Sequence, residues 1–185
     1  YKNNKIALVT SQNSNLIGIP GHPEFLVITD GKTDSKGNLW VLNSESASRK
    51  PLSVKTNLTS WINFSFSNPL ISENDVLDKL VIDQYDTKWF TIAAKGREGL
   101  YYFNENKTLN DLTDDIQGYL STNNNLQSNL ISALAVDARS NLWIGTSSGL
   151  NMIASVDVRT DPTKVKVTGV HGAADQIEIV TCIAV

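Results

Sequence analysis

Residues 130–151 read LISALAVDARSNLWIGTSSGLN and carry the clearest signal of the fold. An apolar run ends at Asp137, and a short polar turn separates it from a second apolar run that contains Trp143. Val, Ile and Trp favour strands, whereas Asn141 favours the turn because it tolerates left-handed backbone. The stretch therefore predicts a β-hairpin, followed by a third strand that begins at Gly149.

The same pattern occurs three times along the chain. In each copy an Asp precedes a Trp by six positions: Asp34 and Trp40, Asp83 and Trp89, Asp137 and Trp143. An apolar stretch precedes each Asp, and a strand-like run follows each Trp. A repeated unit of roughly 40 to 50 residues with several short strands is typical of a β-propeller blade, whereas a sandwich or barrel predicts no such repeat. The predicted fold is therefore all-β, a β-propeller of four-stranded antiparallel blades.

The repeat makes the chain, residues 1–185, a single partial propeller of about three blades with pieces at both ends. The predicted segments are the end of a preceding blade at 1–24, blades at 25–66, 67–120 and 121–170, and the first strand of a further blade at 171–185. The fourth strand of each blade is the least regular, and we place these strands at 60–66, within 111–119 and at 164–170. Propellers close with about 4 to 8 blades. Two arrangements would satisfy this: a fragment of a longer chain, or terminal pieces that pair into one shared fourth blade.

Composition excludes several classes of function. The formal net charge is -3 and the pI about 5.3, so the basic surface of a nucleic-acid binder is missing. No apolar run of the length that spans a bilayer occurs. The single cysteine, Cys182, excludes an internal disulfide framework and a cysteine-rich zinc site. With two histidines and no dinucleotide or phosphate-binding fingerprint, the sequence predicts no cofactor.

The third copy resembles the two-component regulator propeller repeat, which runs as an apolar strand, an Asp, a Gly/Asn turn, Leu-Trp-Ile-Gly-Thr and then Gly-Leu. The matching positions are Asp137, Asn141, Leu142, Trp143, Ile144, Gly145, Thr146, Gly149 and Leu150. The first copy keeps Asp34 and Trp40 but has Val-Leu-Asn after the Trp, and the second keeps Asp83 and Trp89 with Phe-Thr-Ile. The resemblance is strong in one copy and partial in the other two.

This resemblance implies an exported domain of a Bacteroidetes-type bacterium, in the periplasm or on the Gram-negative cell surface. The family that carries this repeat occurs in two settings. One is a PorZ-like surface component of type IX secretion, which implies a protein partner in a secretion complex. The other is the periplasmic glycan-sensing domain of a hybrid two-component histidine kinase. We expect a non-catalytic binding or scaffold module in either setting, with the PorZ-like role first and the sensor as the alternative.

Propeller ligands usually bind at one end of the central channel, on loops that differ between blades. The loop at 94–98 carries Lys95 and Arg97, whose fixed positive charges suit an anionic glycan or a lipopolysaccharide head group. Tyr102 alternates with its neighbour along the following strand and is a further candidate contact. Trp61 stands outside the repeat register, on the fourth strand of its blade, so exposure and contact with a partner are expected there sooner than at the repeated tryptophans, and Trp61 is a candidate contact.

The repeated residues have a structural interpretation. Trp40, Trp89 and Trp143 occupy one position of each blade, which predicts packing between blades rather than sugar stacking. Asp34, Asp83 and Asp137 are explained as turn residues. Adjacent carboxylates such as Asp114 and Asp115 do not supply the fixed separation that acid–base catalysis needs, so we expect no enzyme. Neither the group Asp30, Asp34 and Asn38 nor the segment 104–111 has the spacing of a calcium loop, so no metal is predicted.

Overall fold

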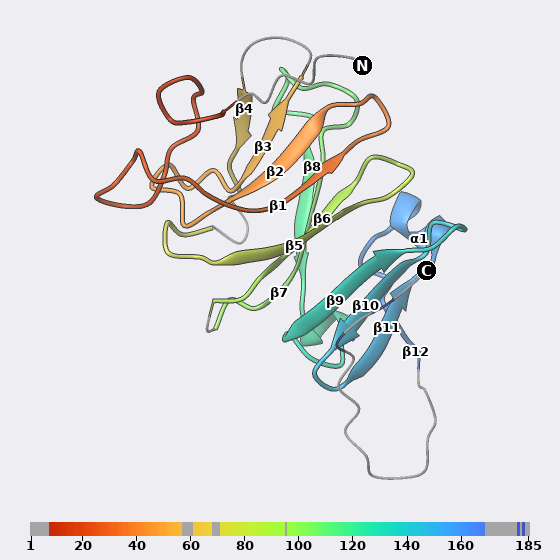
Figure 1. The fold of residues 1–185 in the computed structure, drawn as a ribbon. Coiled ribbons are helices and arrows are strands. Elements are labelled where there is room, and N and C mark those ends of the chain that lie inside the picture. The colour runs from red at the N-terminus through yellow and green to blue at the C-terminus, as the bar shows by residue number, and fades with distance from the viewer. Residues whose placement is uncertain are drawn as a thin grey trace, which may run out of the picture.

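A computed structural model describes residues 8–56, 61–67, 71–94, 96–168, 181 and 183. Within these residues the chain forms three antiparallel sheets of four strands each, which lie one after another in chain order (Figure 1). The first sheet holds β1 (Val27–Thr33), β2 (Leu39–Ser44), β3 (Leu52–Lys55) and β4 (Trp61–Phe64). The second holds β5 (Leu77–Ile82), β6 (Lys88–Ile92), β7 (Gly99–Asn104) and β8 (Ile116–Leu120). The third holds β9 (Ile131–Val136), β10 (Leu142–Thr146), β11 (Gly149–Ile153) and β12 (Lys166–Thr168).

Each sheet pairs its strands in sequence order, so we call the three sheets blades 1, 2 and 3. Each lies within one of the predicted blade ranges, whose boundaries stay a prediction. Because the strands alternate in direction, the first-to-second and third-to-fourth connections share one end of a blade, which we call the turn end. The second-to-third connection lies at the opposite end, the loop end. Blade 3 differs from the other two, because a helix that the sequence did not predict, α1 (Ser155–Thr160), lies between β11 and β12.

The repeated Asp holds the first turn of each blade together. In blade 1 the Asp34 carboxylate accepts the backbone N–H groups of Lys36 and Asn38, and the Trp40 indole N–H at 2.9 Å. The same Trp-to-Asp bond measures 2.8 Å in blade 2 and 2.9 Å in blade 3. The residue three positions after the Asp has left-handed backbone in every copy, with φ of 80° at Gly37 and 61° at Asp86. The six-residue spacing therefore follows from one turn geometry.

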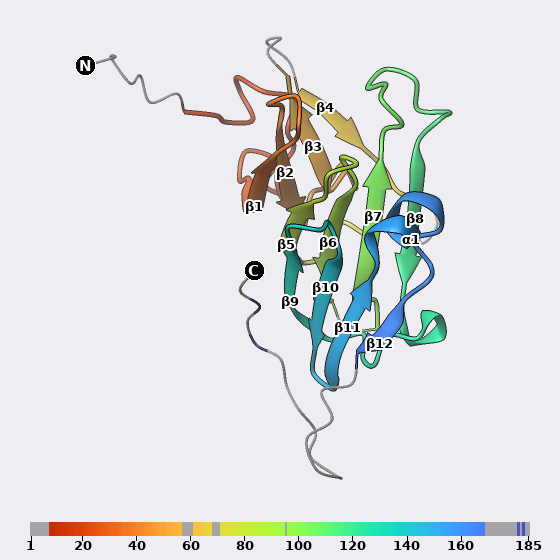
Figure 2. The ribbon, with the colours of Figure 1, turned by 90° about the vertical axis from the view of Figure 1, so that its right-hand side faces the viewer.

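Two apolar cores join the blades. The core between blades 1 and 2 contains Trp40, Leu42, Leu52, Val54, Phe64, Phe66, Ile71, Leu77, Leu80, Phe90, Ile92, Tyr101 and Phe103. The core between blades 2 and 3 contains Trp89, Leu100, Leu120, Leu126, Leu142, Ile144, Ile153, Val158 and Val165. Trp40 and Trp89 are fully buried, each on the face of its blade that packs against the next blade. Stacking of one sheet on the next is visible in Figure 2.

Trp143 differs from the other two repeated tryptophans. Its indole makes the same bond to Asp137, but the side chain is only partly buried. It lies on the face of blade 3 opposite the second core, since Trp143 and its neighbour Leu142 point to opposite faces of β10. No sheet in the described part of the chain covers this face.

Residues 8–26 cross the outer face of blade 1. They hold one isolated bridge, between Ile19 and His22, and none of the twelve strands. Leu16 is buried there in a small third core with Val41 and Trp61. The predicted strand at 171–185 falls outside the described residues, apart from positions 181 and 183.

Candidate ligand-binding site

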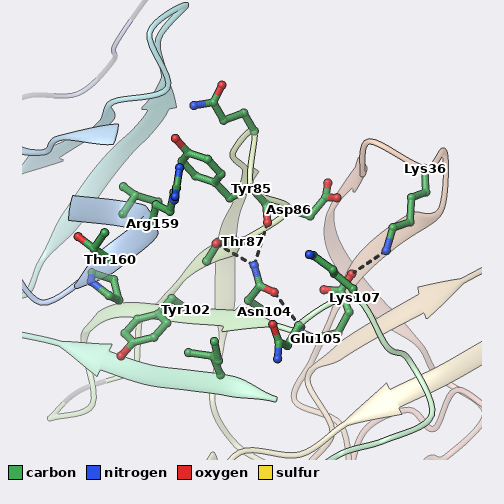
Figure 3. A pocket seen from close by; sticks show the side chains of 15 residues that line it. Lys36, Tyr85, Asp86, Thr87, Tyr102, Asn104, Glu105, Lys107, Arg159 and Thr160 are labelled. Atoms are coloured by element: carbon green, nitrogen blue, oxygen red, sulfur yellow. Dashed lines mark hydrogen bonds and ion pairs between the residues drawn. The ribbon is translucent and has the colours of Figure 1, made fainter. Parts of the chain in front are cut away.

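A cavity of about 930 Å³ opens at the turn end, where all three blades contribute residues (Figure 3). Blade 1 provides Lys36, blade 2 provides the turns at 84–87 and 104–107 together with Tyr102, and blade 3 provides residues 158–160 of α1. A volume of this size accommodates a ligand of drug or oligosaccharide size. Since most of the lining comes from turns and a helix, most of these side chains can vary without disturbing the sheets.

Hydrogen bonds fix the blade 2 wall of the cavity. The Asn104 side-chain amide donates to the Tyr85 carbonyl at 2.9 Å and to the Thr87 hydroxyl at 3.1 Å. Its side-chain oxygen accepts the backbone N–H of Asn106 at 2.8 Å. One side chain therefore links the β5–β6 turn to the β7–β8 turn, and both turns present a defined surface to the cavity.

Helix α1 forms the opposite wall and contacts blade 2 through Ser155. The Ser155 hydroxyl lies 3.2 Å from the side-chain amide of Gln84 and 3.3 Å from the Tyr85 hydroxyl. The backbone N–H of Ser155 donates to Asn141, a residue of the repeated turn of blade 3. Tyr85 is thus held between two blades, with its ring at the edge of the cavity (Figure 3).

Beneath the cavity lies a buried ion pair. Lys88 is fully buried and bonds to Glu105, a cavity residue that is only 2% exposed. The Lys88 ammonium also lies 3.9 Å from the centre of the Trp40 ring, across the interface between blades. Burial lowers the pKa of Lys88, and the hydrogen bond and charge of Glu105 oppose that shift. Lys36 from blade 1 reaches the other Glu105 oxygen at 3.9 Å.

Tyr102 lines the cavity, whereas Arg97 does not. Its ring packs against Trp89 with the ring centres 5.4 Å apart. Burial raises the pKa of the Tyr102 hydroxyl, and the nearby Asp161 charge adds to the shift. Tyr102 therefore joins the cavity to the core between blades 2 and 3.

The other predicted contact residues lie elsewhere. Lys95 falls outside the described residues. Arg97 lies in the β6–β7 loop at the loop end of blade 2, and its Nε is 3.2 Å from Asp75, which is 2% exposed. The structure does not bring Arg97 together with Tyr102, because Arg97 lies in the loop before β7, whereas Tyr102 lies within β7 and lines the turn-end cavity.

The expectation that Trp61 is exposed needs correction, because the side chain is only 5% exposed. Residues 8–26 cover it: the Asn15 side chain donates to the Trp61 carbonyl at 2.7 Å and accepts the Trp61 N–H at 3.2 Å. Asn15 thus bonds along β4 much as a neighbouring strand would. Nothing in the spacing of the repeat indicated that this segment would pack on blade 1.

Apart from Tyr102, the sequence did not indicate the residues of the site, among them Tyr85 and Arg159 in the lining and Lys88 beneath it. Lys88 could have been noticed, since the position before the repeated Trp is Leu39 in the first copy and Leu142 in the third. A lysine in a position that is otherwise apolar indicates a buried partner of opposite charge. Tyr85 and Arg159 carried no such signal, because their placement depends on how α1 packs against blade 2.

Acidic residues gather beside the cavity without forming a metal centre. Burial raises the pKa of Asp115 to about 6, and the charges of Asp114, Glu105 and Asp111 add to that shift. Within the described residues, no group of three or more His, Cys, Asp or Glu side chains is arranged to hold a metal ion. The described part of the chain also has no helix with the length and hydropathy of a membrane span.

Comparison with known proteins agrees with this architecture. The family model "Two component regulator propeller" matches residues 125–148, which include most of the stretch from which the fold was predicted. No curated protein sequence matches the chain. The described residues form blades of a β-propeller, as the sequence predicted, and the match at 125–148 confirms the predicted resemblance to the regulator propeller repeat.

Two solved structures are similar to this chain. One is PorZ of Porphyromonas gingivalis, described as an essential bacterial surface component of the type-IX secretion system, with a TM-score of 0.75 and 21% identity. That match covers 97% of this chain and 26% of PorZ. The other is the extracellular domain of the putative hybrid two component system BT3049 from B. thetaiotaomicron, with a TM-score of 0.50 and 17% identity, covering 70% of this chain and 16% of that one. At these identities the similarity shows a shared fold.

Proposed function

We propose that this chain is a non-catalytic binding and scaffold module of an exported β-propeller protein, with a PorZ-like role at the bacterial surface. The turn-end cavity binds its ligand, a glycan or a lipopolysaccharide-type saccharide. The observation that carries the proposal is a cavity of about 930 Å³ whose walls come from three blades and are fixed by internal hydrogen bonds. Its place in a secretion or signalling complex is proposed from the relatives, of which this chain covers about a quarter or less.

The chemistry of the cavity suits a saccharide. Tyr85 and Tyr102 provide aromatic surface for the apolar face of a sugar ring. Asn104, Asn106 and Thr160 provide amide and hydroxyl groups that can exchange hydrogen bonds with sugar hydroxyls. Because the turns are already held by bonds between protein groups, little loop ordering is needed when the ligand binds.

The test is an NMR titration of the ¹⁵N-labelled chain with a panel of bacterial oligosaccharides. We expect a bound saccharide to shift the amide signals of Gln84, Thr87 and Asn106. Tyr102→Ala should weaken binding at least about tenfold, which corresponds to the loss of one aromatic contact of about 1.4 kcal/mol. The matched control is Arg97→Gln at the loop end, which should leave the affinity unchanged.

Shift changes at the loop end would contradict a binding site in the turn-end cavity. If a saccharide shifts the amides of Gly96 and Arg97 instead, and Arg97→Gln abolishes binding, the ligand site is the one predicted from the sequence. If no saccharide in the panel shifts any amide, the chain is not a glycan-binding module.

A glycan-sensing domain of a hybrid two-component histidine kinase is the alternative function, favoured by the family model at 125–148 and by the BT3049 likeness. The two roles differ in the partner that the propeller contacts. Surface biotinylation of intact cells of the source bacterium, followed by crosslinking, separates them. A crosslink to an outer-membrane secretion component supports the PorZ-like role, whereas a periplasmic protein continuous with a kinase supports the sensor.

A further inference from the structure

Of the charged side chains that line the cavity, the two carboxylates have partners in the described structure, whereas two cations form no ion pair. Lys107 stands on the β7–β8 turn and Arg159 on α1, and Figure 3 shows them on different sides of the cavity. Both residues are exposed, and in the described part of the chain neither forms an ion pair with a carboxylate. A ligand that enters the cavity would therefore meet two unpaired cationic groups.

The two carboxylates in the lining already have partners. Glu105 is bonded to Lys88 and also faces Lys36 at 3.9 Å. Asp86 accepts the Ser35 backbone N–H at 2.9 Å and the Ser35 hydroxyl at 2.6 Å. Their oxygens are engaged in holding blade 1 against blade 2, so they are poorly placed to bind a cation.

The turn that carries Lys107 is built to present it. Asn106 and Lys107 both have left-handed backbone, with φ of 44° and 77°. Asn104 holds this turn by accepting the Asn106 N–H, and Thr108 closes it by donating its N–H to the Glu105 carbonyl at 2.9 Å. A turn that is fixed on both sides loses little entropy when Lys107 binds a ligand.

We infer that the saccharide held in this cavity is acidic, with a carboxylate or phosphate group that Arg159 and Lys107 bind together. This inference rests on the proposed function, since it names the class of sugar for the same site. Arg159 can bind a carboxylate or phosphate through two parallel hydrogen bonds, and Lys107 adds a point charge from the other side. The tyrosine rings and the asparagine amides bind the rest of the sugar.

The experiment compares matched charged and neutral probes by isothermal titration calorimetry. The probes are tetragalacturonate with its methyl ester, and glucose 6-phosphate with glucose; inorganic phosphate controls for simple anion binding. We expect the charged member of at least one pair to bind about tenfold or more tightly than its neutral partner, and its affinity to fall when salt is raised. Which pair discriminates tells whether the group is a carboxylate or a phosphate.

Three variants test which residues cause the preference for the charged probe. Arg159→Gln and Lys107→Gln should each weaken the charged probe about five- to tenfold and leave the neutral probe unchanged. Lys50→Gln, an exposed lysine in the β2–β3 loop at the other end of blade 1, should change neither. Unfolding midpoints of all three variants should match the parent, because these side chains are exposed.

Three results would overturn the inference. Equal binding of charged and neutral probes would leave a saccharide site that does not select charge, so the proposed function would stand without the inference. Equal binding of inorganic phosphate and glucose 6-phosphate, without binding of tetragalacturonate, would show a plain anion site. If no charged probe binds while a neutral saccharide of the earlier panel does, the cavity binds a neutral sugar.

Discussion

The ammonium group of Lys88 in blade 2 lies 3.9 Å from the centre of the Trp40 ring in blade 1, buried between the two sheets. Glu105 completes the arrangement as the carboxylate that pairs with this cation. The pair links the core between blades to the floor of the cavity, because Glu105 also lines that cavity. A substitution in this pair should therefore affect the free energy of unfolding before it affects the cavity.

Removing one member of the pair should be costly. Glu105→Leu leaves Lys88 buried without its counter-ion, and we expect the free energy of unfolding to fall by about 3 to 5 kcal/mol. The double variant Lys88→Leu with Glu105→Leu should lie within about 1 kcal/mol of the parent, because apolar residues replace the whole pair. Urea unfolding followed by tryptophan fluorescence measures both. If the double variant is as unstable as the single one, the loss of stability does not come from leaving Lys88 without its counter-ion.

The repeated tryptophans should differ in their contribution to stability. Trp89→Ala empties a site in the core between blades 2 and 3 and should cost about 3 to 5 kcal/mol. Trp143→Ala should cost about 1 to 2 kcal/mol, because that side chain is already partly in water in the described structure. Equal losses in urea unfolding would show that Trp143 is as deeply buried as Trp89.

The three hairpins and their repeat could be predicted because one turn geometry imposes an Asp and a Trp six residues apart, and no other part of the chain needs to be known. Features that depend on contacts between distant segments could not. Trp61 is buried by residues 8–26, and Tyr85 is positioned by Ser155, some 70 residues further on. Of the predicted contact residues, Tyr102 lies in the cavity, whereas Arg97 pairs with Asp75 at the other end.

Asp115 should make stability depend on pH near neutrality. Its pKa in the folded chain is about 6, above the ordinary value of about 3.9, because burial and neighbouring carboxylates disfavour its charge. The folded state thus binds this proton more tightly than the unfolded state. The ionised carboxylate therefore lowers the free energy of unfolding fully above pH 6, and this loss disappears as the pH falls towards 4. Since Asp115 Oδ1 has no hydrogen-bond partner among the described residues, Asp115→Asn should raise the urea midpoint at pH 7.5 and not at pH 4.

Asp111 is the matched control for that prediction. Hydrogen bonds from the Thr113 hydroxyl and N–H lower the pKa of Asp111. Its contribution to stability is therefore present above the ordinary pKa and is lost as pH falls. Asp111→Asn should lower the midpoint at pH 7.5 and have little effect at pH 3. At pH 7.5 the urea midpoint should therefore rise in Asp115→Asn and fall in Asp111→Asn. A lower midpoint in Asp115→Asn would show that the charge of Asp115 does not destabilise the folded chain.

Gly118 should control the position of Tyr102. A methyl group at position 118 would overlap the hydroxyl end of the Tyr102 ring on the neighbouring strand β7. Gly118→Ala should therefore displace that ring, cost about 1 to 3 kcal/mol in stability and weaken saccharide binding. Gly37→Ala is the comparison, since nothing lies within 4 Å of its added methyl group. That variant strains the turn at φ 80° without touching Tyr102, so it should lower stability and leave the affinity intact.

We propose that ligands bind at the turn end, in the cavity to which all three blades contribute residues. The most direct measurement is a map of amide shift changes in the ¹⁵N-labelled chain titrated with an acidic oligosaccharide, tetragalacturonate. We expect the largest shift changes at Thr87, Asn106, Lys107 and along α1, and none at Gly96 and Arg97 at the loop end. If the largest changes fall on Gly96 and Arg97, with none along α1, the ligand does not bind in the turn-end cavity.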